Sequence, residues 1–488
     1  MKRIAILFTS IMVLLGCTAQ SEQTSSQPEL RFKEDGTFKI LQLSDPHWDG
    51  APERNARLEE IITKVVDKEN PDFIMLTGDV VLNPNEVMSQ WKDVINILES
   101  TSIPYSVVPG NHDPECADMD EVYDLLLQQP HFIGEKGPEE LTGIGNFALE
   151  VKASDGSGKT QAVMYCFDSG NISSSREDYG YYYWLEADQI DWYKARSREY
   201  KAANGNKPVP SVAFFHIPLP EYNYIRPIDR HGFFGERVCC PEINSGMYFS
   251  MSRMGDIMGT FVGHDHNNDF IGKFFNIALA YGRTTGWGLS RECEAGGRVI
   301  ILKEGKHQFE TYNTTPDKTE FTYYYPSGIT TKDKEQYAYH PSLDVKPTEN
   351  GLKYTYCEGN FLSTDDIRKI GKNHQSGVMP NFDITKATAK DHFAYIFEGY
   401  VNITESDVYI FYINSDDGAK LYIDGELLLD NDGSHGTDRK GAKIGLEKGF
   451  HEIRVDYFDD YAEEELRVRM TSTNIPLGKI DDKNLFIK

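Results

Sequence analysis

Side chains that commonly bind metal ions follow a series of short apolar runs in the first part of the sequence. They are two carboxylates, one amide and four imidazoles: Asp45, His47, Asp79, Asn111, His216, His264 and His266. Oxygen and imidazole ligands in this mixture suit Mn, Zn or Fe better than Ca or Mg. The sequence therefore predicts a centre for two metal ions and leaves their identity open.

The spacing of these residues indicates that they share one site. In Asp45-x-His47 and His264-x-His266, residues i and i+2 of an extended segment point to the same side. The carboxylate of Asp79 can bridge two cations, and two cations about 3.5–4 Å apart can bind the oxygens of a phosphate ester. Glycines allow the backbone to turn sharply beside such a site, and three of them precede the motifs: Gly78, Gly110 and Gly263.

The apolar runs ahead of these motifs predict the elements that must position them. Strands are expected over residues 38–43, 73–77, 105–108, 212–216 and 259–263, and helices over 53–68 and 86–99. Such alternation of strands and helices is typical of a layered α/β fold. The carboxyl ends of the strands then lie along one edge of a sheet, so we expect the motifs to converge there.

The order of the motifs resembles the calcineurin-type metallophosphoesterase superfamily, whose pattern is D-x-H, GD, GNH(D/E), H and GHxH. The resemblance covers about Phe38 to Leu302, and Gly145-Asn-Phe and Phe215-His-Ile-Pro-Leu are similar to a purple-acid-phosphatase-like branch. It implies a two-sheet sandwich flanked by helices over residues 31–313. It also implies a phosphoric ester hydrolase (a phosphatase) in which a metal-bound hydroxide attacks phosphorus.

The resemblance further assigns individual roles. One metal ion is expected to take Asp45, His47, Asp79 and His266, and the other Asp79, Asn111, His216 and His264. His112 is expected to face the substrate and to protonate or stabilise the leaving group, with Asp113 orienting its ring. Purple acid phosphatases carry a tyrosine ligand shortly after the bridging aspartate, but here Val80-Val81-Leu82 follow Asp79. We therefore expect no ferric–tyrosinate centre.

The segment 221–240, directly after His216, combines arginines with aromatic residues. A loop of this kind beside the metal edge is predicted to bind the leaving group, and Arg237 is its first candidate. The alternative is a surface loop whose arginines pair with acidic neighbours.

The net charge of the chain excludes two kinds of partner. A formal net charge of −26 over 488 residues argues against binding to nucleic acid or to an anionic membrane surface, since both need a basic face.

The N-terminal segment indicates where the protein is located. Lys2 and Arg3 precede an apolar run over 4–15 that is too short to span a bilayer and is typical of a signal peptide. Gly16-Cys17 resembles a bacterial lipobox and implies lipidation of Cys17 after a signal peptide over residues 1–17. We expect a flexible tether over 18–30 and an exported lipoprotein, anchored only by its acyl chains on the periplasmic or cell-surface side; an ordinary signal peptide is the alternative.

The C-terminal part of the chain differs in texture. A polar, proline-containing linker is predicted over 314–348, an all-β sandwich over 349–475 and a tail over 476–488, with Asp424-Gly425 as a type I′ hairpin turn. Ser415-Asp-Asp-Gly and Gly449-Phe-His-Glu-Ile resemble the protective-antigen-type β-sandwich, which implies glycans as a partner. We interpret Asp416-Asp417 as a turn, with calcium binding as the alternative because paired carboxylates suit Ca²⁺.

Three functions remain open on the sequence. The first is a phosphatase, and the second is a phosphodiesterase acting on nucleotides or on phospholipid or sugar-phosphate groups. The third is a carbohydrate-binding surface lipoprotein whose phosphatase domain is not catalytic. Six cysteines after Cys17 permit disulfides in an exported protein without defining their pairing.

Overall fold

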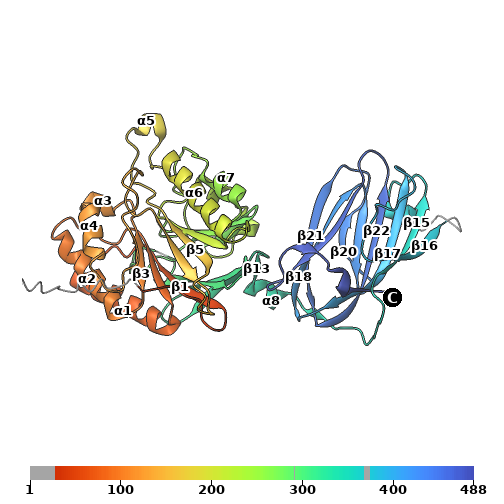
Figure 1. The fold of residues 1–488 in the computed structure, drawn as a ribbon, viewed down its shortest axis with the longest axis horizontal. Helices are drawn as coiled ribbons and strands as arrows, with labels where there is room; N and C mark the ends of the chain where they lie inside the picture. The colour runs from red at the N-terminus through yellow and green to blue at the C-terminus, as the bar shows by residue number, and fades with distance from the viewer. Residues whose placement is uncertain (1–27, 291, 368–373) are drawn as a thin grey trace, which may run out of the picture.

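The computed structural model of this chain describes residues 28–290, 292–367 and 374–488. Two domains lie side by side along the longest axis, and the segment with β13 (Ile329–Thr330) and α8 (Thr331–Gln336) connects them (Figure 1). The predicted signal peptide, Cys17 and most of the tether lie outside the described residues. Within the described ranges, no helix combines the length and the apolar character needed to cross a membrane.

The first domain contains two β-sheets. The first has the order β13-β12-β11-β10-β1-β2-β3 and the second the order β4-β5-β6-β7-β9-β8. In the first sheet β1 (Thr37–Leu43), β2 (Phe73–Thr77) and β3 (Tyr105–Val108) are parallel, and β10 (Gly297–Lys303) pairs antiparallel with β1. The second sheet consists of β4 (Phe147–Lys152), β5 (Thr160–Cys166), β6 (Ser211–Phe214), β7 (Ile257–Val262), β8 (Ile271–Phe274) and β9 (Ile277–Tyr281).

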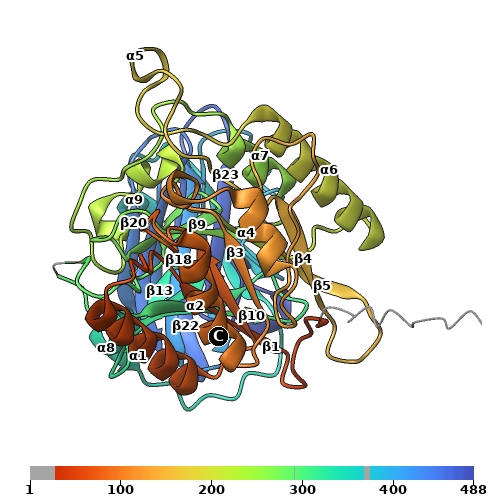
Figure 2. The ribbon, with the colours of Figure 1, turned by 90° about the vertical axis from the view of Figure 1, so that its left-hand side faces the viewer.

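Helices cover the outer face of each sheet (Figures 1 and 2). On the first sheet they are α1 (Pro52–Glu69), α2 (Val87–Ser100) and α4 (Met119–Leu126), and on the second α6 (Ala187–Ala203) and α7 (Met247–Met254). The two faces of β5 show the layering: Met164 packs in the core shared with the first sheet, whereas Val163 packs in the cluster that contains Tyr193 of α6. Successive strand residues point to opposite faces. The predicted two-sheet sandwich flanked by helices is therefore confirmed.

The segment after β11 (Phe309–Thr314) differs from the predicted linker. It forms β12 (Thr319–Tyr325), which pairs with β11 and extends the first sheet together with β13. Tyr323 and Tyr325, two residues apart, are 2% and 4% exposed and pack in the core of the first domain. The first domain therefore extends to about residue 330 rather than ending at 313. The sequence did not indicate this, because prolines and polar residues conceal the period-two pattern of the strands.

The second domain is a β-sandwich. One sheet has the order β16-β15-β17-β22-β19-β20, with β25 on β17, and the other the order β14-β21-β18-β23-β24. Its strands are β14 (Tyr339–His340), β15 (Leu352–Glu358), β16 (Gln375–Met379), β17 (Phe393–Ile403), β18 (Asp407–Asp416), β19 (Ala419–Ile423), β20 (Glu426–Asn431), β21 (Asp438–Leu446), β22 (Gly449–Asp459), β23 (Glu465–Thr471), β24 (Gly478–Lys479) and β25 (Leu485–Phe486). Asp424 and Gly425 join β19 and β20 with φ values of 49° and 83°, as a type I′ turn requires. The all-β prediction is confirmed.

A buried ion pair supports the loop that leads from β9 toward β10. The Arg283 guanidinium donates from Nε to Asp269 Oδ2 at 2.9 Å and from Nη1 to Glu320 at 2.8 Å, and Arg283 is 2% exposed. The next residues bind the loop after β1, since the amides of Thr285 and Gly286 donate to the carbonyls of Ser44 and Asp45. The Arg283–Asp269 pair thus stabilises a loop that touches the predicted metal ligands.

We expect the substitution Arg283→Ala to lower the free energy of unfolding by about 3–5 kcal/mol, because it leaves a buried carboxylate without its cation. All five tryptophans precede β10, so tryptophan fluorescence during urea unfolding reports on the first domain. Arg253→Ala removes an exposed arginine and serves as the matched control. Equal unfolding midpoints for the two variants would show that the pair does not stabilise the domain.

Candidate metal centre

Each predicted ligand lies just beyond the carboxyl end of a strand. Asp45 and His47 follow β1, Asp79 follows β2 and Asn111 follows β3 in the first sheet. In the second sheet His216 follows β6, and His264 and His266 follow β7. The parallel strands of both sheets end at a common edge, so residues far apart in the sequence meet there.

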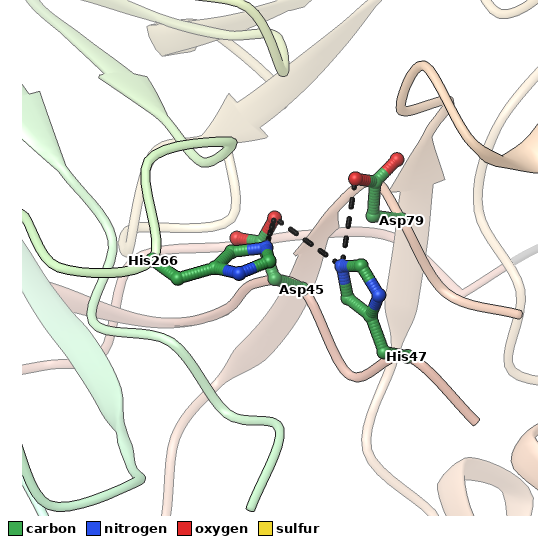
Figure 3. Close-up of side chains that lie close together, drawn as sticks. All are labelled: Asp45, His47, Asp79 and His266. Carbon is green, nitrogen blue, oxygen red and sulfur yellow. Dashed lines mark ion pairs between the residues drawn. The ribbon is translucent and has the colours of Figure 1, made fainter. Parts of the chain in front are cut away.

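Four of the seven residues form a first group. The ligand atoms of Asp45, His47, Asp79 and His266 all lie within 4.8 Å of one another. His266 Nε2 lies 3.5 Å from Asp45 Oδ1, and His47 Nε2 lies 3.5 Å from Asp79 Oδ2. Figure 3 shows the His47 ring directed toward both carboxylates.

Asp79 also belongs to a second group, with His216 and His264. His216 Nε2 lies 3.2 Å from Asp79 Oδ2 and 3.1 Å from Asn111 Oδ1. The structure thus brings all seven predicted ligands together in the two sets that the sequence resemblance implied. Asp79 occupies the position between the sets, as a bridging carboxylate must.

The backbone at the site is unusual. Four of the ligands have φ in the left-handed region: 51° at Asp45, 51° at His47, 52° at Asp79 and 81° at His264. This conformation costs a non-glycine residue about 1–3 kcal/mol and persists where the surroundings enforce it. Such strain at several members of one cluster favours a functional site.

Glycine is required where β2 and β3 end. A Cβ atom on Gly78 would lie 2.5 Å from the Cα of Gly110, and a Cβ atom on Gly110 would lie 2.2 Å from the amide nitrogen of Asp79. Side chains at these positions would therefore push the Asp79 and Asn111 loops apart. The close backbone approach predicted for these glycines is present.

The hydrogen bonds of the imidazoles fit metal ions. His216 Nδ1 lies 2.8 Å from the Thr77 carbonyl, which can only accept, so this nitrogen carries the proton. His216 Nε2 faces the oxygens of Asn111 and Asp79, so either a proton or a cation must lie between this nitrogen and these oxygens. Within the described ranges, the buried Nε2 atoms of His47 and His264 also have no hydrogen-bond partner.

The charges at the site are strongly coupled. Burial alone would raise the pKa of Asp45, yet the hydrogen bond from His266 and the charges of His216 and His266 lower it to about 2. The pKa of Asp79 lies well below its usual value against the same effect of burial, because of His216 and His47. Burial and the charge of His216 lower the pKa of His264 to about 3. Burial lowers the pKa of His216, yet the charges of Asp79 and Asp45 raise it to about 10, so two ionised carboxylates face a protonated His216 and a neutral His264.

His112 stands beside the metal groups without belonging to either. It lines a cavity of about 270 Å³ together with Asp79, Asn111 and His264. Its Nδ1 atom lies 2.7 Å from Glu115 Oε2. The ring therefore faces the space in which a substrate phosphate would bind.

The observed role of Asp113 differs from the expected one. Its carboxylate accepts the backbone N–H groups of Gly110, Asp79 and Val80 at 2.8–2.9 Å and does not bind the His112 ring. The reason is local: α3 (Asp113–Cys116) begins at Asp113, whose side chain turns back beneath the β2 and β3 loops. Glu115 was not predicted as a site residue, although its i,i+3 spacing from His112 at a helix start is a signal for this contact.

Aromatic residues from a distant loop also reach the site. The Tyr182 ring packs edge-on against His264 with centroids 4.6 Å apart, and Tyr181 lines the same cavity. Burial, with nearby Cys239, raises the pKa of Tyr182 to about 12. Neither tyrosine was predicted, because nothing in the Tyr181-Tyr-Tyr-Trp run indicates which strand edge it covers.

The position at which purple acid phosphatases carry their tyrosine ligand is apolar in this chain. Val80 and Val81, which follow Asp79, are buried and offer no side-chain oxygen.

Arg237 lies in a second cavity next to the metal cavity. The two cavities share Tyr181, Tyr182 and Cys239, whereas Arg237 and Tyr224 line only the second. Among the described residues, Arg237 forms no ion pair with a carboxylate. The structure thus places Arg237 beside the metal centre rather than against its ligands.

Two other expectations concern cysteines and calcium. The described cysteines are free thiols: Cys116, Cys166, Cys239, Cys240, Cys293 and Cys357. The Asp417 carboxylate accepts the amides of His435, Asp460 and Tyr461, and Asp417 has φ 48°, which supports the interpretation as a turn. Calcium binding at Asp416-Asp417 stays a prediction.

Comparisons with known proteins agree with this geometry. The family model described as calcineurin-like phosphoesterase matches residues 38–268, and that of the PA14 domain matches residues 348–483. A protein of Arabidopsis thaliana named probable inactive purple acid phosphatase 29 is 29% identical over 62% of this chain and 86% of its own length. Phosphatase DCR2 of Saccharomyces cerevisiae is 27% identical over 49% of this chain and 46% of its own length.

Among solved structures, a dimetal phosphatase from Danio rerio is 11% identical, covers 58% of this chain and 98% of its own, and aligns with a TM-score of 0.41. The family models, the curated relatives and the ligand set lead to one conclusion. The chain contains a calcineurin-like phosphoesterase domain related to purple acid phosphatases, followed by a C-terminal PA14 domain.

Proposed function

We propose that this protein hydrolyses phosphate esters at the two-metal centre. The observation that carries the proposal is the completeness of the ligand set: seven side chains in two groups that share Asp79. A site that has lost catalysis is expected to have lost ligands, and here every position of the motif pattern is filled. When bound, two metal ions would activate a water molecule and neutralise the phosphate oxygens.

The remaining residues of the cavity have separate tasks. Asp79 and Asp45 would hold the cations, and the His216 ring is fixed by its hydrogen bond to the Thr77 carbonyl. His112 is not used by either metal group, so it is free to donate a proton to the departing oxygen of the ester. The same arrangement can hydrolyse a diester if the second ester group, here called the second arm, fits beside the metal centre.

The second cavity supplies room for the second arm. Its walls include the rings of Tyr181, Tyr182 and Tyr224, which suit a planar group, and the guanidinium of Arg237 can stack on such a group. Glu115 and Glu236 line the metal cavity and Glu242 the second one, so three glutamates oppose one arginine. These charges favour a neutral aromatic arm over a second phosphate group.

Location and accessory binding complete the proposal. Lys2, Arg3, the apolar run 4–15 and Cys17 support export and lipid anchoring of the chain. The match of residues 348–483 to the PA14 domain supports glycan binding by the second domain. Both parts of the proposal are independent of catalysis.

Removal of the metal ions should abolish activity. We expect protein purified without chelator to carry about two metal ions per chain and to hydrolyse p-nitrophenyl phosphate. Asp79→Asn should lose metal and lower kcat by at least about 100-fold, because one carboxylate serves both groups. Elemental analysis and steady-state rates measure both effects, and Asp67→Asn, at an exposed position on α1, is the control.

If the purified protein binds no Mn, Zn or Fe and hydrolyses neither mono- nor diesters, the phosphatase proposal fails. This outcome is worth testing for, because the Arabidopsis thaliana relative is named a probable inactive purple acid phosphatase. The alternative is then a glycan-binding surface protein with a non-catalytic phosphoesterase domain.

Arg237→Gln should affect only substrates with a second arm. We expect KM for bis(p-nitrophenyl) phosphate to rise about 5–10-fold with kcat unchanged, since the lost contact is made equally in ground and transition states. KM for p-nitrophenyl phosphate should stay constant. Arg226→Gln, an exposed arginine paired with Asp229, is the matched control. Equal effects of Arg237→Gln on both esters would show that Arg237 does not contact the second arm.

A further inference from the structure

Glu115 is bound to the ring of His112. The distance from His112 Nδ1 to Glu115 Oε2 is 2.7 Å, and both residues line the metal cavity with Asp79 and Asn111. Both side chains are 38% exposed, so they lie at the mouth of the cavity. A carboxylate can only accept from an imidazole, so Nδ1 carries the hydrogen of this bond.

The local backbone holds the pair together. His112 is the residue before α3, and the amide of Glu115 donates to the His112 carbonyl at 3.2 Å. Residues i and i+3 of such a turn lie on the same face, so the two side chains meet without a change of backbone. Asp113 cannot replace Glu115, because backbone amides of Gly110, Asp79 and Val80 already occupy its carboxylate.

We infer that Glu115 is a positioning residue for proton transfer to the leaving group. Its carboxylate accepts the hydrogen on His112 Nδ1 and thereby fixes the plane of the ring, which turns Nε2 toward the departing oxygen. This inference rests on the proposed phosphate-ester hydrolysis. It assigns to Glu115 the orienting role that the sequence resemblance gave to Asp113.

Hydrolysis of the ester then consumes one water molecule. The oxygen of water forms a bond to phosphorus while the ester P–O bond breaks, and the leaving oxygen keeps the electron pair of that bond. The leaving oxygen takes the proton from His112 Nε2, and the proton released by the attacking water restores the ring. The products are an alcohol and inorganic phosphate.

The test compares esters whose leaving groups differ in their need for a proton. p-Nitrophenolate leaves without protonation, whereas the phenolate of phenyl phosphate is more basic and gains more from a positioned acid. We expect Glu115→Gln to lower kcat for phenyl phosphate about 10-fold and kcat for p-nitrophenyl phosphate less than about 2-fold, with KM unchanged. Glu121→Gln, at an exposed position on α4, is the matched control and should equal the wild type on both esters.

A second measurement separates orientation from a general structural effect. In the His112→Ala background, Glu115→Gln should have no further effect on phenyl phosphate, because residues that act as a unit are not additive. Metal content and Tm of Glu115→Gln should match the wild type, since the carboxylate is partly exposed and is not a metal ligand.

The outcomes distinguish the two proposals. A wild-type protein that hydrolyses neither ester overturns the proposed function, and with it this inference. A wild-type protein that hydrolyses both, with equal loss on both esters in Glu115→Gln, overturns the role of Glu115 and leaves the proposed function standing. A full effect of Glu115→Gln in the His112→Ala background does the same.

Discussion

The structure of the first domain depends on two ionised carboxylates that are buried side by side. Asp45 is 1% exposed and Asp79 is 2% exposed, and the imidazoles around them keep the pKa of each below its ordinary value. Burying charge is costly unless partners of opposite charge or metal ions are close. The fold meets this constraint by directing side chains from both sheets to one edge, where four histidines surround the two acids.

The backbone must come unusually close to allow this convergence. Gly78 and Gly110 permit the ends of β2 and β3 to touch, and a Cβ atom on Gly263 would lie 2.2 Å from the hydroxyl of Ser44, so glycine brings the β7 loop equally close to β1. The left-handed φ values of ligands such as Asp45 and His264 are a consequence of the same crowding. Hydrogen bonds from neighbouring segments hold this conformation, among them those from the amides of the loop 283–286 to the carbonyls of Ser44 and Asp45. Hydrogen bonds from segments beside the site therefore offset the backbone strain of the predicted metal ligands.

Sequence patterns were sufficient where one strong signal decides the structure. Strands β2 and β3 span the predicted residues, because each is a short apolar run that ends abruptly in glycine and polar residues. The seven predicted ligands lie together in the structure, and the sequence could indicate them because residue type and spacing are themselves the chemical requirement of a metal site. The strands β12 and β13 were missed because prolines and polar residues conceal the alternation of Tyr323 and Tyr325.

Sequence patterns did not predict the contacts that depend on the direction in which a side chain points. Asp113 and Glu115 are both near His112 in the chain, and only the start of α3 determines that the first binds amides and the second binds the ring. Tyr182 reaches His264 from a loop more than 80 residues earlier, so no local pattern reveals the contact.

The net charge of the chain bears on the role of the charged residues that line the two cavities. A protein with net charge −26 repels phosphate esters over most of its surface, so attraction must be local. Glu115, Glu236 and Glu242 line the two cavities, and Arg237 is the arginine among the lining residues. In the proposed function the phosphate would bind at the metal ions deeper in the cavity, and Glu115 at its mouth is already bound to His112. The glutamates that line the cavities do, however, disfavour further anionic groups on the substrate. In the proposed function, Glu115 thus positions the ring of His112, whereas Glu236 and Glu242 favour a substrate whose second arm is neutral.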